Sequence, residues 1–311
     1  MPTAYARRTA AAALALASLL TAATAGCSRR DAPPDPAHLA AVEAWHAARV
    51  ERLRDEAGWL TLVGLHPLPE GATTLGSAAD AGARLPASAP ARLGVVTADS
   101  AGFRFAADPG ARVYRIAQGD TIAVDRAELI PDNPGPPTVL HAGTLLFHVV
   151  MRGGRGFLRV KDRESEVRRG FTGIERFPVG GRWRVTARLE PHDPPRGVMV
   201  PDVLGNLEES PSPGTLVFDL EGRECRLTPI GGPGEELFIV FADATSGGET
   251  YGGGRFLSAD PPGPDGTVVL DFNLATNPPC AFTPFATCPL PPQGNTLPVA
   301  VRAGEKSWGH H

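Results

Sequence analysis

Three segments in the second half of this chain contain polar side chains of the types that bind small molecules or catalyse reactions. They are "FADATSGGETYGGGRFL" at 241–257, "DFN" at 271–273, and the stretch that runs on to "GEK" at 304–306. The candidate side chains carry a carboxylate, an amide, a hydroxyl or a positive charge, and they are Asp243, Thr245, Tyr251, Arg255, Asp271, Asn273, Asn277, Glu305 and Lys306. We expect them to bind a small polar or anionic ligand.

The carboxylates of this set would allow acid–base chemistry if the fold brought them together. Carboxylates that share a pocket push each other's pKa values apart, so that one can donate a proton while another accepts one. Asp243, Asp271 and Glu305 are the candidates for that chemistry, and Arg255 or Lys306 could hold a substrate carboxylate or phosphate. Such residues would make a metal-independent hydrolase.

A structural role accounts for the same residues. An Asp that follows a strand often caps a turn, and an Asn such as Asn273 can satisfy loop amides. Asp243 and Arg255 could form an ion pair that fixes two loops. We favour structure over catalysis for these residues, because Asp and Asn are common in the surface loops of any β protein.

Two cysteines, Cys280 and Cys288, are separated by seven residues that include Pro284. In an oxidising compartment we expect them to form a disulfide that closes a small ring and rigidifies the loop. A zinc site is not expected, because no Cys-x-x-Cys and no histidine pair lies close by in the sequence. A thiol nucleophile would need a nearby basic partner such as histidine. A redox role stays open, although this spacing matches no redox motif.

The N-terminus is a targeting segment. Arg7 and Arg8 precede "AAALALASLLTAATA", an apolar run too short to span a bilayer as a mature helix, and Gly26 and Cys27 follow it. Small residues and a cysteine after such a run resemble a bacterial lipoprotein signal. We expect residues 1–27 to be this signal, Cys27 to carry the lipid, and the protein to be held at a membrane of the cell envelope in the periplasm or outer membrane.

The elements that must position the candidate residues are mostly strands. After a polar tether at 28–36, the stretch 37–57 has apolar residues at helical spacing and predicts one helix. Short β-branched or alternating runs punctuated by Gly, Pro, Asp and Asn then fill 58–162 and 163–311. The sequence therefore predicts a mainly β protein, with one N-terminal helix followed by two β-sandwich or barrel-like units.

The first β unit opens with "GWLTLVGLHPLPEGATTLGSAADAGARLP", which is similar to the start of a forkhead-associated domain. That family reads phosphothreonine with a Gly-Arg pair and a downstream Ser-x-x-His. Here Ser77 follows Gly76 and no Ser-x-x-His follows, so the arginine that would grip the phosphate is missing. The resemblance implies a sandwich topology and does not support phosphopeptide binding.

Composition excludes several classes of protein. Hydrophobic residues make up 42% and charged residues 21% of the chain, which is typical of a globular protein. The net charge of -4 comes without a stripe of lysine and arginine interleaved with aromatic residues, so we expect no nucleic-acid partner. We also expect no cofactor.

Four pieces of the chain resemble the domain-of-unknown-function family 1684, many of whose members are bacterial envelope proteins. They are "GWLTLVGL", "FADATSGGETYGGGRF", "DFNLATNPPCAFTPFATCPLPP" and "AGEK". The resemblance runs over nearly the whole mature chain, and its C-terminal signature is quite specific. It implies no reaction, because the family has no established one.

Three hypotheses for the function follow from the sequence. The leading one is a non-catalytic, lipid-anchored envelope protein that binds a small polar or anionic ligand, or a partner, in the second β unit. The second is the hydrolase that uses paired carboxylates, with Arg255 and Lys306 as electrostatic stabilisers. The third is a purely structural envelope protein.

Overall fold

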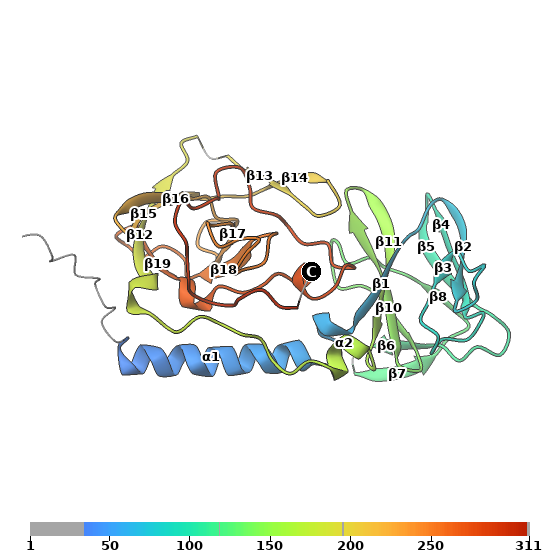
Figure 1. Ribbon diagram of the computed structural model, residues 1–311. Coiled ribbons are helices and arrows are strands. Elements are labelled where there is room, and N and C mark those ends of the chain that lie inside the picture. Colours follow the sequence, from blue (N-terminus) through green and yellow to red (C-terminus); the bar gives the residue numbers. More distant parts are fainter. Residues whose placement is uncertain (1–33, 118, 195, 310–311) are drawn as a thin grey trace, which may run out of the picture. The chain divides into compact units, whose positions relative to one another are not determined.

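The computed structural model describes residues 34–117, 119–194 and 196–309. The predicted signal peptide, the lipid-carrying Cys27 and most of the tether lie outside the described residues. Within them the prediction of a mainly β protein with one N-terminal helix is confirmed, and the strands form several sheets with no closed barrel (Figure 1). No helix of the described part is long and apolar enough to cross a membrane.

The N-terminal helix, α1 Pro36–Arg54, begins and ends at residues that explain its limits. The side chain of Asp35 accepts a hydrogen bond from the amide of Ala37, and Pro36 occupies the first turn, where its missing N–H costs nothing. The helix ends three residues before the predicted limit, since Asp55 adopts an extended backbone conformation. Val42 and Leu53 are the buried residues of this helix.

Two sheets form the first set of strands and enclose one core between them. The six-stranded sheet has the order β1-β11-β10-β9-β6-β7, and the five-stranded sheet has the order β3-β2-β4-β5-β8. Side chains from both sheets, such as Phe105 and Phe147, meet with ring centroids 5.7 Å apart. Apart from the parallel pair β2–β3, neighbouring strands are antiparallel.

The strands of the first set are β1 Leu62–Pro67, β2 Gly71–Gly76, β3 Ala83–Arg84, β4 Gly94–Asp99, β5 Gly102–Ala107, β6 Tyr114–Ala117, β7 Asp120–Ala123, β8 Arg126–Glu128, β9 Val139–Ala142, β10 Leu145–Arg152 and β11 Arg155–Asp162. Short helical turns flank this set, and they are η1 Trp59–Thr61, α2 Glu166–Arg169 and η2 Gly181–Trp183. The last strand of the set ends where the first predicted β unit ends, at Asp162.

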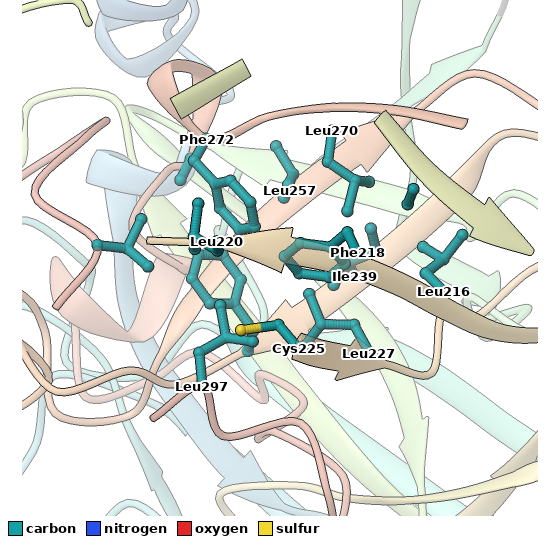
Figure 2. Packing of buried hydrophobic residues seen from close by; sticks show 14 of the residues in the cluster. Leu216, Phe218, Leu220, Cys225, Leu227, Ile239, Leu257, Leu270, Phe272 and Leu297 are labelled. Carbon is teal, nitrogen blue, oxygen red and sulfur yellow. The ribbon is translucent and has the colours of Figure 1, made fainter. Parts of the chain in front are cut away.

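The second set of strands forms a four-stranded sheet, β16-β15-β12-β19, and the two hairpins β13–β14 and β17–β18. Its strands are β12 Arg184–Pro191, β13 Val198–Pro201, β14 Leu207–Ser210, β15 Gly214–Leu220, β16 Arg223–Leu227, β17 Leu237–Phe241, β18 Arg255–Ala259 and β19 Thr267–Asp271. Inward side chains of the four-stranded sheet pack against those of the β17–β18 hairpin, as Phe218, Ile239 and Leu270 show in Figure 2. This core holds the hairpin that carries the predicted site.

The C-terminal segment, residues 272–309, is almost free of regular structure and is nevertheless buried. It contains the short turns η3 Phe272–Leu274 and η4 Pro279–Ala281. Its apolar residues Leu297 and Val301 complete the second core. A buried irregular segment must find partners for its backbone amides and carbonyls away from a sheet, and the predicted site residues supply many of them.

Gly304 marks a point where this segment can accept no side chain. Its φ is +72°, and a Cβ built on it would lie 2.4 Å from the carbonyl oxygen of Ala275. Gly266 has nearly the same φ, +75°, but no atom lies within 4 Å of its would-be Cβ. Comparing substitutions at the two glycines therefore separates the cost of backbone strain from the cost of steric overlap.

We expect Gly304→Ala to lower the free energy of unfolding by roughly 4 kcal/mol or more, because overlap with backbone adds to strain. Gly266→Ala should lower it by only about 1–2 kcal/mol, since strain alone remains. Urea unfolding followed by circular dichroism measures both. Equal losses for the two variants would contradict the close approach at Gly304.

Candidate functional site

The predicted site residues of the β17–β18 hairpin form a buried ion pair. Arg255 Nη2 lies 2.8 Å from Asp243 Oδ2, and both side chains are 0% exposed. Asp243 Oδ1 also accepts hydrogen bonds from the amide and hydroxyl of Thr245, at 2.8 and 2.6 Å, and from the amide of Val301 at 3.2 Å. The carboxylate is therefore fully occupied by partners from its own loop and from the C-terminal segment.

Arg255 also binds the same C-terminal segment through its Nη atoms, while its Nε is buried without a hydrogen-bond partner among the described residues. Its Nη atoms donate to the carbonyl oxygens of Ala303, Val301 and Glu305, the last two at 2.8 and 3.4 Å. Burial lowers the pKa of Arg255, and the Asp243 carboxylate opposes that shift. The ion pair anticipated as the structural alternative is confirmed, and it ties the hairpin to 301–305.

Glu305 and Asn277 form a second buried set that reaches the N-terminal helix. Glu305 Oε2 accepts from the amide of Asn277 at 2.7 Å, and Oε1 accepts from Arg49 Nε at 3.2 Å. Arg49 Nη2 donates to the carbonyl oxygen of Asn277 at 3.1 Å, and Asn277 Nδ2 donates to that of Lys306 at 2.7 Å. Burial raises the pKa of Glu305, while Arg49 acts in the opposite direction.

Asp271 and Asn273 make a third set. The Asn273 amide pairs with both backbone groups of Gly180, at 3.0 and 3.1 Å, and donates to Asp271 Oδ1 at 2.7 Å. The other oxygen of Asp271 lies 2.6 Å from Nε2 of His38, on α1. Sequence reasoning missed both His38 and Arg49, because each is more than 200 positions away from its carboxylate partner.

Tyr251 and Lys306 are the two predicted residues that line an open groove. The glycine loop between β17 and β18 and the chain end around Ser307 enclose about 730 Å³. The lining residues are Glu175, Gly247, Gly248, Glu249, Thr250, Tyr251, Gly252, Gly253, Lys306, Ser307 and Gly309. Lys306 Nζ contacts Glu175 Oε2 at 3.3 Å, and Glu249 pairs with Arg302 at 2.8 Å.

The cysteines lie beside this groove's tyrosine. Cys280 and Cys288 carry free thiols, so the predicted disulfide is not formed in this structure. The amide of Cys280 nevertheless donates to Cys288 Sγ at 3.1 Å, which places the two residues in direct contact. The hydroxyl of Tyr251 donates to the carbonyl oxygen of Cys280 at 3.3 Å.

The predicted residues therefore divide between buried and accessible positions. Asp243, Thr245, Arg255, Asn273, Asn277 and Glu305 are buried. Asp271 is engaged with His38, which leaves Tyr251 and Lys306 facing the groove. Among the described residues, no group of three or more His, Cys, Asp or Glu side chains could hold a metal ion.

Comparison with known proteins places this site within one family. Residues 169–306 match the family model described as "Protein of unknown function (DUF1684)". The chain is also similar to an uncharacterized protein of Haloarcula marismortui solved by solution NMR. The two are 34% identical over 46% of this chain and 81% of that one, with a TM-score of 0.39. No curated protein matches.

We expect Arg255→Met to lower the free energy of unfolding by about 3–5 kcal/mol, because it leaves the Asp243 carboxylate buried without its counter-charge. Arg302→Met is the matched control in the same segment. Its ion pair with Glu249 is exposed, and its loss should cost only about 0–1 kcal/mol. Denaturant unfolding measures both variants. A loss at Arg255 no larger than at Arg302 would contradict the anchoring role of the buried pair.

Proposed function

This chain belongs to the DUF1684 family of proteins of unknown function, and we propose that it is a non-catalytic envelope protein that binds a small anionic ligand. The ligand would occupy the groove between the glycine loop and Lys306. The proposal rests mainly on one contrast. The groove is open and polar, whereas Asp243, Glu305 and Arg255 are buried and paired, and Asp271 is paired with His38.

Lys306 gives the groove its preference for an anion. Its ammonium is bound by Glu175, whose side chain is 81% exposed. An exposed pair of this kind is worth only about 0–1 kcal/mol, so an incoming carboxylate or phosphate can replace Glu175 at little cost. The other carboxylate of the groove, Glu249, is engaged by Arg302.

The glycine loop supports binding by bringing backbone close to the groove. Gly247, Gly248, Gly252 and Gly253 all line it, and without side chains they let a ligand approach the main chain. Packing also requires a glycine at position 253, because a Cβ on Gly253 would lie 2.6 Å from the Tyr251 ring. The loop is held in place by the buried pair at its two ends, which favours a preformed site.

The two alternative functions draw different support. The hydrolase is less favoured, because Asp243 and Glu305 are buried among fixed donors and Asp271 is held by His38. The purely structural protein is supported by the three sets of buried polar contacts, which need no ligand. It leaves the groove beside Lys306 without a role.

Location in the envelope is part of the proposal. A lipid on Cys27 would hold the mature protein at a membrane, and export would place the chain in an oxidising compartment. Under those conditions Cys280 and Cys288, already in contact, would join as a disulfide. The mature protein would then be a lipoprotein with its groove exposed on the anchored domain.

The ligand can be tested by thermal unfolding with a panel of phosphate, citrate, glycerol phosphate, neutral sugars and betaine. We expect an anion to raise the melting temperature, because a ligand that binds only the native state stabilises it by mass action. Lys306→Met should abolish the rise while keeping the apolar stem of the side chain. Arg226→Met, on β16 and outside the groove, should retain it. A rise that persists in Lys306→Met, or no rise with any anion, would exclude this site.

The anchor can be tested by fractionating cells that express the full chain. Cys27→Ala should move the protein from the membrane fraction to the soluble one, because the lipid has no other attachment point in the predicted signal. Ser28→Ala is the control and should stay with the membrane. Membrane retention of Cys27→Ala would refute lipidation at this residue.

A further inference from the structure

Arg159, on β11, is a buried cation without a carboxylate partner. The residue is only 6% exposed, and it forms no ion pair with any described residue. Its Nη2 donates to the hydroxyl of Thr287 at 3.1 Å, and its Nε is buried with no hydrogen-bond partner among the described residues. Burying an unpaired charge is unfavourable, so Arg159 would be stabilised by a negative charge that the nearby carboxylates do not provide.

The groups that face Arg159 leave its charge uncompensated. The nearby carboxylate, Asp132, is held by Arg152 through two hydrogen bonds at 3.1 and 2.8 Å. Lys161 is a further cation, and burial lowers the pKa of His148 to about 4, so that histidine is neutral at pH 7. Arg159 keeps its charge, since burial lowers its pKa only to about 10. Its guanidinium lies 5.7 Å from the ring centroid of Trp59.

The cysteine loop packs directly onto this cation. Thr287 receives hydrogen bonds from both Arg159 and Arg152, at 3.1 and 2.9 Å, and the next residue is Cys288. Cys288 packs with Leu62 of β1, and Thr283 donates to the carbonyl oxygen of Leu62 at 3.1 Å. The sheet of the first set therefore places its unpaired charge against the residue next to Cys288.

The two thiols lie in contact and differ in exposure. Cys280 is half-buried and Cys288 is buried, and the amide of Cys280 donates to Cys288 Sγ at 3.1 Å. A hydrogen bond from the Cys288 thiol lowers the pKa of Cys280, and the Tyr251 hydroxyl acts in the same direction. That bond and burial raise the pKa of Cys288, while Arg159 acts against the rise. The titratable and charged groups around the pair are the neutral Tyr251, the cation Arg159 and, through Thr287, Arg152.

We propose that Cys280 and Cys288 form a thiol–disulfide exchange site, in which Arg159 is the positioning residue that stabilises the thiolate of the resolving residue, Cys288. The more exposed sulfur, Cys280, attacks a small external disulfide and forms a mixed disulfide, and the displaced thiolate leaves and takes up a proton. Cys288 then loses its proton and attacks Cys280 Sγ, which releases the second small thiol. Two protein thiols and one external disulfide thus become one protein disulfide and two small thiols.

This inference goes beyond ligand binding in the groove and does not depend on it. Stabilising a thiolate favours the reduced form of the pair, so the protein disulfide becomes a stronger oxidant than a simple structural staple. The contact between the cysteines then serves exchange with other thiols as well as rigidity of the loop.

The test uses the reduced full-length protein with oxidised glutathione as the external disulfide. Cys288→Ser should accumulate a mixed disulfide between glutathione and Cys280, located by peptide mass spectrometry, because the resolving sulfur is gone. Cys280→Ser should form none, since Cys288 is buried. Cys225, the third cysteine of the described chain, is buried in the second core and should stay unmodified.

The role of Arg159 is measured by the pH dependence of the step in which Cys288 displaces glutathione from Cys280, and by equilibration with a glutathione buffer. Arg159→Met should shift that profile upward by roughly one pH unit and favour the disulfide about tenfold. Arg159→Lys should restore part of both, and Arg155→Met, an exposed position on the same strand, should change neither. Circular dichroism confirms that each variant is folded.

Tyr251→Phe provides a second test if Arg159→Met fails to fold. Tyr251→Phe removes the hydroxyl that lowers the pKa of Cys280, and it should shift the pH dependence of alkylation at Cys280 upward. No mixed disulfide in Cys288→Ser would overturn the exchange site. A profile that is unchanged in every folded variant of Arg159 and Tyr251 would overturn the assigned thiolate stabilisation.

Discussion

The guanidinium of Arg255 holds together segments that no sheet connects. It neutralises Asp243 at the start of the glycine loop and donates to carbonyl oxygens along 301–305. The C-terminal segment needs such partners because it is buried but has little regular structure, and a buried carbonyl without a donor costs free energy. The second core in Figure 2 includes Leu297 of this segment, so the core and the polar contacts are formed together.

The same constraint explains why the signature residues are poor candidates for catalysis. Asp243, Asn273 and Glu305 are polar because they satisfy backbone amides and carbonyls of a buried loop. A side chain that is fixed by two or three partners has little freedom to bind and release a substrate. Function is therefore to be sought at the margins of this network, in the groove beside Lys306 and at the thiols of the cysteine loop.

The groove beside Lys306 and the cysteine loop both contact the glycine loop through Tyr251. The tyrosine lines the groove and donates to the carbonyl of Cys280, and burial raises its pKa to about 12, so it keeps its proton over the physiological range. The cysteine loop reaches in the other direction to β1 and β11 of the first set of strands. The first set thus contributes a cation to chemistry carried by the second.

Sequence alone determined the features that depend on local patterns. Alternating apolar runs predicted strands because the side-chain period of a strand is two, and Asp35–Pro36 marks the start of α1 because capping is local. The proximity of Cys280 and Cys288 followed from their spacing. Tertiary structure alone decided that His38 meets Asp271, that Arg49 meets Glu305, and that Arg159 meets Thr287 beside Cys288. Those contacts join residues more than 100 positions apart, and they depend on how whole elements pack, which no local period encodes.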